Sequence, residues 1–149
     1  MSFYKPAKLP KLMVAPNGAR KVKKDHPAVP LTISETVATA KSCYKAGASA
    51  IHLHVRDKEG QHVLDVGLYK EALNELEHQV PNMHIQVTTE AVGKYSPADM
   101  RKLAYDVTPP GASIGTSELI PSRQPEEEDI KLYKHLTEAG TKIQHILYK

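Results

Sequence analysis

The chain has 149 residues, of which 40% are hydrophobic and 25% charged, with a formal net charge of +3. This composition is that of an ordinary globular domain and excludes a disordered or fibrous protein. A single cysteine excludes an internal disulfide framework and a cysteine-based zinc cage. The small net charge and the 5% aromatic content argue against nucleic-acid binding. The first twelve residues lack the apolar stretch of a signal peptide, and no apolar run reaches the ~20 residues of a membrane span, so we expect a cytoplasmic protein without a membrane partner.

Short apolar runs alternate with helical patterns along the whole chain. Thr32 followed by Glu35 predicts a capping box at the start of the first helix, and Gly47 predicts a left-handed residue after its end. Ser96 followed by Pro97 predicts the start of another helix. In chain order, the pattern predicts strands over residues 12–15, 50–55, 83–89, 112–115 and 143–148, and helices over residues 33–46, 67–79, 97 onward and 126–138.

Strands that alternate with helices indicate parallel pairing through right-handed crossovers. Two architectures fit this order, an open doubly wound sheet and part of a (β/α)₈ barrel. The first loop, residues 16–31, lacks the G-x-G-x-x-G fingerprint of dinucleotide-binding folds, and its length suits a barrel whose active site is built from such loops. We therefore predict an α/β fold of the (β/α)₈ TIM-barrel type, represented by about the first five strands and four helices.

Two histidines at the end of the second predicted strand carry the strongest chemical signal. His52 and His54 are two positions apart, so their side chains point to the same face of a strand, while Ile51, Leu53 and Val55 point to the other. Imidazole nitrogens at the carboxyl end of a barrel strand are typical ligands of a catalytic Zn²⁺. A catalytic zinc needs a third protein ligand, which the five strands do not obviously supply. The alternative is a pair of hydrogen-bonded histidines in a polar barrel mouth. His145 is a further candidate, because the fifth strand could direct it toward the same mouth.

Polar residues follow the other predicted strands at the same rim. Asn17 comes directly after the first strand, Thr88 and Glu90 end the third, and Ser113 lies on the fourth. Such side chains could bind a substrate carboxylate, although capping of the loops explains them equally well. Arg20 belongs to a basic cluster in the first loop, which either attracts an acidic ligand or is simply solvated.

Several short motifs between residues 15 and 65 are shared with one enzyme family, and the resemblance extends over essentially the whole chain. They are Ala15-Pro16-Asn17-Gly18-Ala19-Arg20, Asp25-His26-Pro27-Ala28-Val29-Pro30, Ala46-Gly47-Ala48, His52-Leu53-His54-Val55-Arg56-Asp57, Gly60 and Leu64-Asp65. In this combination the sequence resembles the β-keto acid cleavage enzymes, whose best-known activity is the cleavage of 3-keto-5-aminohexanoate.

The resemblance implies a zinc-dependent (β/α)₈ barrel that is usually a homo-oligomer. Its members convert a β-keto acid and acetyl-CoA into acetoacetate and a new acyl-CoA. His52 and His54 match the two metal-binding histidines, and the third ligand, a glutamate of the later half, is not in this chain. Thr88 and Ser113 match hydroxyl residues that contact the substrate, and Glu90 lies near a further contact. The catalytic residues of the late half are not identified here.

Two departures from the family pattern matter. Arg20 stands where the aminohexanoate enzyme has a glutamate, and a guanidinium suits a substrate with a second acidic group better than one with an ammonium group. The second departure is length, because a whole barrel takes ~250 residues. We therefore expect residues 1–149 to be the N-terminal portion of a single TIM-barrel domain in a truncated chain. The alternatives are a metal-dependent TIM-barrel hydrolase and an inactive fragment that acts as a binding or assembly module.

Overall fold

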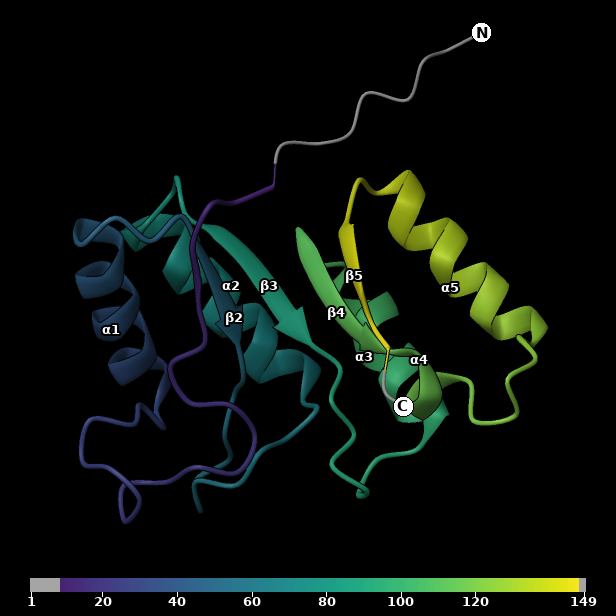
Figure 1. The fold of residues 1–149 in the computed structure, drawn as a ribbon, viewed down its shortest axis with the longest axis horizontal. Coiled ribbons are helices and arrows are strands. Elements are labelled where there is room, and N and C mark those ends of the chain that lie inside the picture. Colours follow the sequence, from purple (N-terminus) through teal and green to yellow (C-terminus); the bar gives the residue numbers. More distant parts are fainter. Residues whose placement is uncertain (1–8, 148–149) are drawn as a thin grey trace, which may run out of the picture.

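The computed structural model describes residues 9–147, so most of the segment examined for a signal peptide, and Tyr148 of the predicted fifth strand, lie outside the described residues. Helices and strands alternate along the chain (Figure 1). Their bounds are β1 Met13–Val14, α1 Ile33–Lys45, β2 Ala50–Leu53, α2 Val66–Gln79, β3 His84–Thr88, α3 Pro97–Val107, β4 Gly111–Gly115, α4 Thr116–Leu119, α5 Glu127–Glu138 and β5 Lys142–Ile146.

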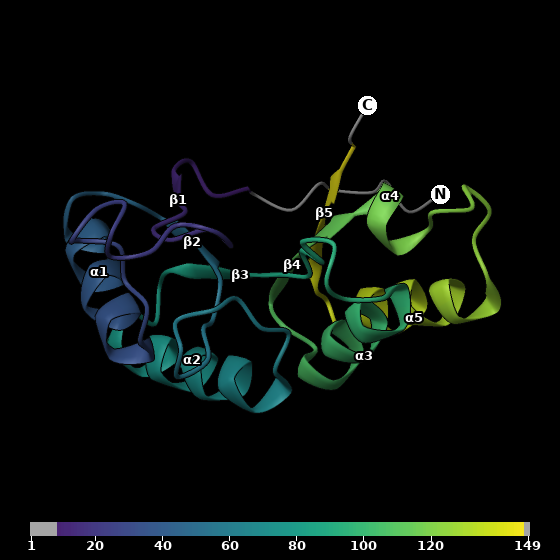
Figure 2. The same cartoon turned by 90° about the horizontal axis from the view of Figure 1, so that it is seen from below.

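The strands form one parallel sheet in the order β1-β2-β3-β4-β5. Each strand pairs with the next one along the chain, whereas a doubly wound sheet reverses its order at a switch point. The longer helices α1, α2, α3 and α5 lie along the same face of this sheet, as seen from below in Figure 2. Sequential pairing with the helices outside is the arrangement of a (β/α)₈ barrel, and the predicted fold class is confirmed.

The predicted helix starts are confirmed in detail. The Thr32 hydroxyl accepts from the amide of Glu35, whose carboxylate accepts from the amide of Thr32. Ser96 and Asp99 form the same reciprocal pair before α3. Gly47 has φ +105°, a backbone conformation that favours glycine at the end of α1.

Two expectations about the elements were wrong. The second strand was predicted to run to residue 55, but β2 ends at Leu53, because residues 54–56 leave the ladder and the backbone at Arg56 pairs with His62 instead. The short helix α4 was not predicted: it directly continues β4 with no loop between them, and no side chain caps its start. A four-residue element without a cap leaves too little pattern in the sequence.

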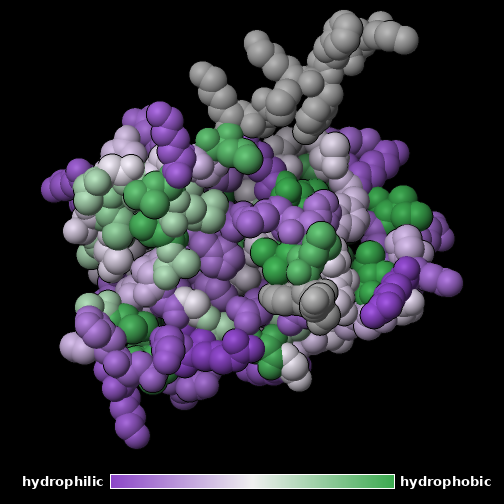
Figure 3. Space-filling view, viewed as in Figure 1, coloured by the Kyte–Doolittle hydropathy of each residue, from purple (hydrophilic) through white to green (hydrophobic). Residues whose placement is uncertain are grey.

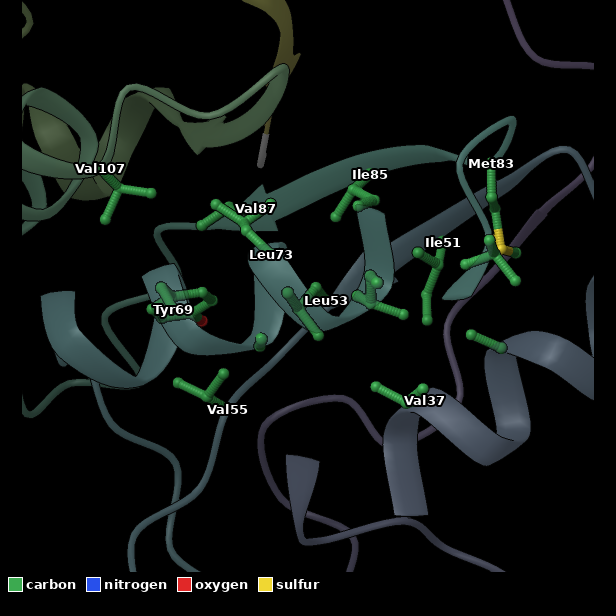
Figure 4. Close-up of a cluster of buried hydrophobic side chains, with 14 of the residues drawn as sticks. Val37, Ile51, Leu53, Val55, Tyr69, Leu73, Met83, Ile85, Val87 and Val107 are labelled. Atoms are coloured by element: carbon green, nitrogen blue, oxygen red, sulfur yellow. The ribbon is translucent and has the colours of Figure 1, made fainter. Parts of the chain in front are cut away.

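The core lies between the sheet and the outer helices. Ile51 and Leu53 of β2 belong to one cluster with Val37 of α1 and with Tyr69 and Leu73 of α2, and Ile51 lies close to Val37 in the close-up of Figure 4. A second cluster packs β4 against α3 and α5. The buried members of that second cluster are Ala91, Met100, Ala104, Ala112, Ile114, Leu119, Leu132 and Leu136.

The surface seen from the side of Figure 1 carries separate hydrophobic patches among hydrophilic residues (Figure 3). In the described part of the chain, every helix is too short or too polar to traverse a lipid bilayer.

Glu35 predicts a pH dependence of stability. A hydrogen bond from Lys23, then those from the Leu31 and Thr32 amides, lower the pKa of Glu35 from its ordinary 4.5 to about 2. A carboxylate with a lowered folded-state pKa stabilises the fold above pH 4.5, and this contribution is lost as the pH falls toward 2. We expect Glu35→Gln to lower the free energy of unfolding at pH 7 by about 0.5–1 kcal/mol, a small effect because the pair is partly solvated.

Urea unfolding of both proteins at pH 7 and pH 3 measures this difference, which should shrink at pH 3. The control is Glu75→Gln, which removes an exposed helical carboxylate with no ion pair among residues 9–147. An equal loss of stability at both pH values would contradict the prediction.

Candidate functional site

The two strand-end histidines converge. His52 lies on β2, His54 is the first residue past its end, and their Nε2 atoms are 3.1 Å apart. Two nitrogens bound to one tetrahedral zinc at ~2.0–2.1 Å would be about 3.3 Å apart. The donor set and its spacing therefore fit a shared divalent metal ion. Within residues 9–147 no cluster of three or more His, Cys, Asp or Glu side chains could hold a metal, so the origin of a third ligand stays a prediction.

The orientation of His52 is fixed from β3. Nδ1 of His52 lies 2.7 Å from Oε1 of Gln86, the residue paired with it in the parallel ladder. Gln86 in turn donates from Nε2 to Oε1 of Gln144 on β5, at 2.7 Å. An amide oxygen only accepts, so Nδ1 of His52 carries the hydrogen and Nε2 keeps its lone pair for a metal.

His54 is buried deeply enough to stay neutral. Burial first, and then the neighbouring His52, His62 and Arg56, lower the pKa of His54 to about 2. Oε2 of Glu90 lies 4.0 Å from its Nε2. The Nδ1 atom of His54 is buried without a hydrogen-bond partner among the described residues. A neutral imidazole with a free nitrogen is the form that binds metal ions.

A row of hydroxyl residues lies next to the histidines. Thr88 is two positions beyond Gln86 on β3, so it shares the inner face with His52, and it pairs with Ser113 on β4. Both side chains are buried. The Thr88 hydroxyl accepts from the amide of Glu90 at 3.1 Å, which places Glu90 at the rim. The predicted residues of β2, β3 and β4 thus come together at the carboxyl end of the sheet.

The first loop is tied to the site by Asn17 and Arg56. Asn17 is buried, and its Nδ2 donates to the carbonyls of Pro30 and His54. The Arg56 guanidinium donates to the carbonyls of Gly18, Ala19 and Lys21. Asn17 therefore positions the loop against His54, and its contact with substrate stays a prediction. Gly18 has φ +58° and open space around it, so a turn explains this glycine.

The basic cluster of the first loop is largely paired with acids. Arg20 is 77% exposed and its Nη1 lies 3.6 Å from Oε1 of Glu90. Lys21 pairs with Asp25, and Lys23 with Glu35. Of these cations, Arg20 alone extends toward the histidine rim within the described chain, through Glu90.

Other polar residues near the rim were missed or misplaced by the sequence reasoning. His62 was not among the predicted site residues, yet its ring centroid is 5.1 Å from that of His54. The feature of the sequence that could have indicated this contact is the turn Asp57-Lys58-Glu59-Gly60, which folds the chain back onto the end of β2. His145 was a candidate for the mouth, but it lies on the outer face of β5, stacked on Tyr133 of α5. Burial, then the charge of Glu90, raise the pKa of Glu118, which was also not predicted.

Comparison with known proteins decides the family. The sequence profile of the beta-keto acid cleavage enzymes matches residues 11–149. The chain belongs to this family. The 3-keto-5-aminohexanoate cleavage enzyme of Fusobacterium nucleatum is 40% identical over 72 residues, which cover 48% of this chain and 26% of that enzyme. The 3-oxoadipate:acetyl-CoA acetyltransferase of Cupriavidus necator is 33% identical over 78 residues, covering 52% and 28%.

Solved structures agree on the fold. ObcA, in a ternary complex with a C4-CoA adduct and oxalate, superposes with a TM-score of 0.64 at 17% identity, covering 80% of this chain and 31% of ObcA. At this level of identity the similarity concerns the fold alone. The matched segments span less than a third of the length of each of these relatives.

Arg56 predicts how this member of the beta-keto acid cleavage enzyme family holds its first loop. A lysine at position 56 keeps the charge but gathers its donors on one nitrogen in place of the planar, wider guanidinium, so most of the three carbonyl contacts would be lost. We expect Arg56→Lys to lower the free energy of unfolding by about 1.5–3 kcal/mol. Amide hydrogen exchange over residues 17–22 should become faster.

Urea denaturation and hydrogen exchange followed by mass spectrometry measure the two effects. Arg123→Lys, at an exposed position, is the matched control and should change neither. Unchanged exchange over residues 17–22 in Arg56→Lys would show that the guanidinium does not hold the loop.

Proposed function

We propose that this chain supplies the two-histidine part of the zinc site of a β-keto acid cleavage enzyme, which converts a β-keto acid and acetyl-CoA into acetoacetate and an acyl-CoA. The observation that carries the proposal is the 3.1 Å separation of the His52 and His54 Nε2 atoms at the carboxyl end of β2. Membership of an acyl-transferring enzyme family supports the same reaction class. The third protein ligand would come from outside residues 9–147.

The residues present fit a bound zinc. Gln86 engages Nδ1 of His52, which leaves the Nε2 lone pair of that ring free for a metal ion. Burial keeps the His54 ring uncharged, which is the form that binds metal ions. Zinc at this position would act as a Lewis acid that polarises the keto oxygen of the substrate.

The chain's own side chains would then bind and orient the acid. The buried hydroxyls of Thr88 and Ser113 lie side by side on the inner face and can donate to a substrate carboxylate. Their burial excludes water from this end of the substrate, which strengthens each hydrogen bond. Glu90, held by the Thr88 hydroxyl, is next to both His54 and Arg20 and faces the same rim.

Arg20 supports a substrate with a second acidic group. Its guanidinium is exposed, 3.6 Å from Glu90, and can pair with a carboxylate that enters from solvent. A relative whose name specifies 3-oxoadipate, a dicarboxylic β-keto acid, is consistent with this preference. The enzyme named for 3-keto-5-aminohexanoate is more similar in sequence, at 40% identity, and its name specifies an amino-substituted substrate.

Metal content tests the zinc proposal. Purified parent protein incubated with zinc and then dialysed should retain near-stoichiometric metal by elemental analysis. The double variant His52→Ala/His54→Ala should retain none, because both nitrogen ligands are gone. His78→Ala, which removes an exposed histidine in the last turn of α2, is the control and should retain zinc like the parent. Metal-free parent protein would count against the site.

Charge selectivity tests the substrate proposal. We expect zinc-loaded protein to bind 3-oxoadipate about 2–5-fold more tightly than 3-keto-5-aminohexanoate, a modest factor because Arg20 is exposed. Arg20→Glu should reverse the order. Lys45→Glu, the same charge change at the exposed last residue of α1, next to the amino end of β2, should leave it unchanged. Isothermal titration calorimetry measures both constants. Tighter binding of the amino acid substrate by the parent would refute the dicarboxylate preference.

A further inference from the structure

His62, a buried histidine beyond the turn that follows β2, has no role in the zinc site proposed above. The turn at Asp57-Lys58-Glu59-Gly60 is closed by the Asp57 side chain, which accepts from the amides of Glu59 and Gln61. Gly60, at φ +77°, completes the reversal. The backbone of His62 then pairs with that of Arg56, and the imidazole ring of His62 lies next to that of His54. Only 5% of His62 is exposed, so its contacts are with protein rather than solvent.

We infer that His62 is a positioning residue for the metal site: its Nδ1 accepts a hydrogen bond from Nδ1–H of His54, directly or through one water, when Nε2 of His54 binds a metal ion. The inference rests on the proposed function, because it assigns His54 as a ligand. It adds a residue that the family motif around His52 and His54 does not include.

The hydrogen positions follow from the contacts. Nε2 of His62 lies 2.9 Å from the carbonyl oxygen of Glu90, which can only accept, so Nε2 carries the hydrogen. In a neutral ring, Nδ1 of His62 is then an acceptor. His54 has the opposite arrangement when its Nε2 lone pair is given to a metal, because the hydrogen must then reside on Nδ1.

The Nδ1 atoms of the two histidines complement each other as donor and acceptor. Nδ1 of His54 and Nδ1 of His62 are both buried and both lack a hydrogen-bond partner among residues 9–147. Their rings are neighbours, with centroids 5.1 Å apart and planes inclined by 62°. A buried donor beside a buried acceptor is stabilised when the two are joined, and a metal-bound imidazole usually donates its second N–H to such a partner. Gln86 has this role for His52, so His62 would complete the pair.

Matched variants separate the two nitrogens of His62. Asparagine places its amide oxygen near the position of Nδ1 and so keeps the acceptor, whereas glutamine reaches the position of Nε2 and keeps only the contact with the Glu90 carbonyl. Leucine keeps neither. By calorimetric titration with zinc, we expect His62→Gln and His62→Leu to bind about 10-fold more weakly or worse, and His62→Asn to remain close to the parent. Circular dichroism and thermal unfolding check that each variant is folded.

A spectroscopic readout needs no variant. In the zinc-loaded parent, ¹H–¹⁵N spectra of the imidazoles should show a hydrogen-bonded Nδ1–H on His54 and an Nε2–H on His62. The opposite hydrogen position on either ring would overturn the inference, as would a folded His62→Gln protein that binds zinc like the parent. If the parent binds no zinc, the proposed function fails and this inference fails with it. If the parent binds zinc and the folded His62 variants bind it equally well, only this inference is refuted and the proposed function stands.

Discussion

Burial of two aliphatic side chains of β2 fixes the geometry on which the site depends. Ile51 and Leu53 are almost completely enclosed against α1 and α2, so β2 has one permitted register in the sheet. A slip by one residue would expose both and bury His52 in their place. The same alternation, continued past the strand end, places Val55 in the core and His54 on the inner side. The convergence of the imidazoles therefore follows from packing on the opposite face.

Polar side chains on the inner face are joined by hydrogen bonds. Gln86 links His52 to Gln144, so contacts of β2, β3 and β5 determine the orientation of one imidazole. Asn17 ties the first loop to the His54 carbonyl in the same way. Buried donors and acceptors are costly unless they are paired, and the hydrogen bond with Gln86 restricts the His52 ring to one orientation. The histidines are held by the sheet, although one of them is no longer in a strand.

Sequence patterns were most informative where one local interaction decides the structure. The caps at Thr32 and Ser96 were predictable because a side chain and an amide three residues on settle the helix start. The face of His52 was predictable from strand alternation. The partnership with Gln86 was not, because it depends on the register between β2 and β3, and His62 arrived through a turn whose direction no periodicity encodes. His145 was misplaced because its face depended on where β5 begins, at Lys142.

Glu90 lies at the rim between the first loop and the histidines. Its carboxylate lies 3.6 Å from the exposed Arg20 on one side and 4.0 Å from the buried His54 on the other. Glu118 is close enough for Glu90 to raise its pKa, so Arg20 offsets the charge of an acidic pair. An acidic residue at position 20 would add a third carboxylate there and favour a cationic substrate group. Under the proposed function, the residue at position 20 would set the charge that the loop presents to substrate, and the buried scaffold that orients the histidines would stay unchanged.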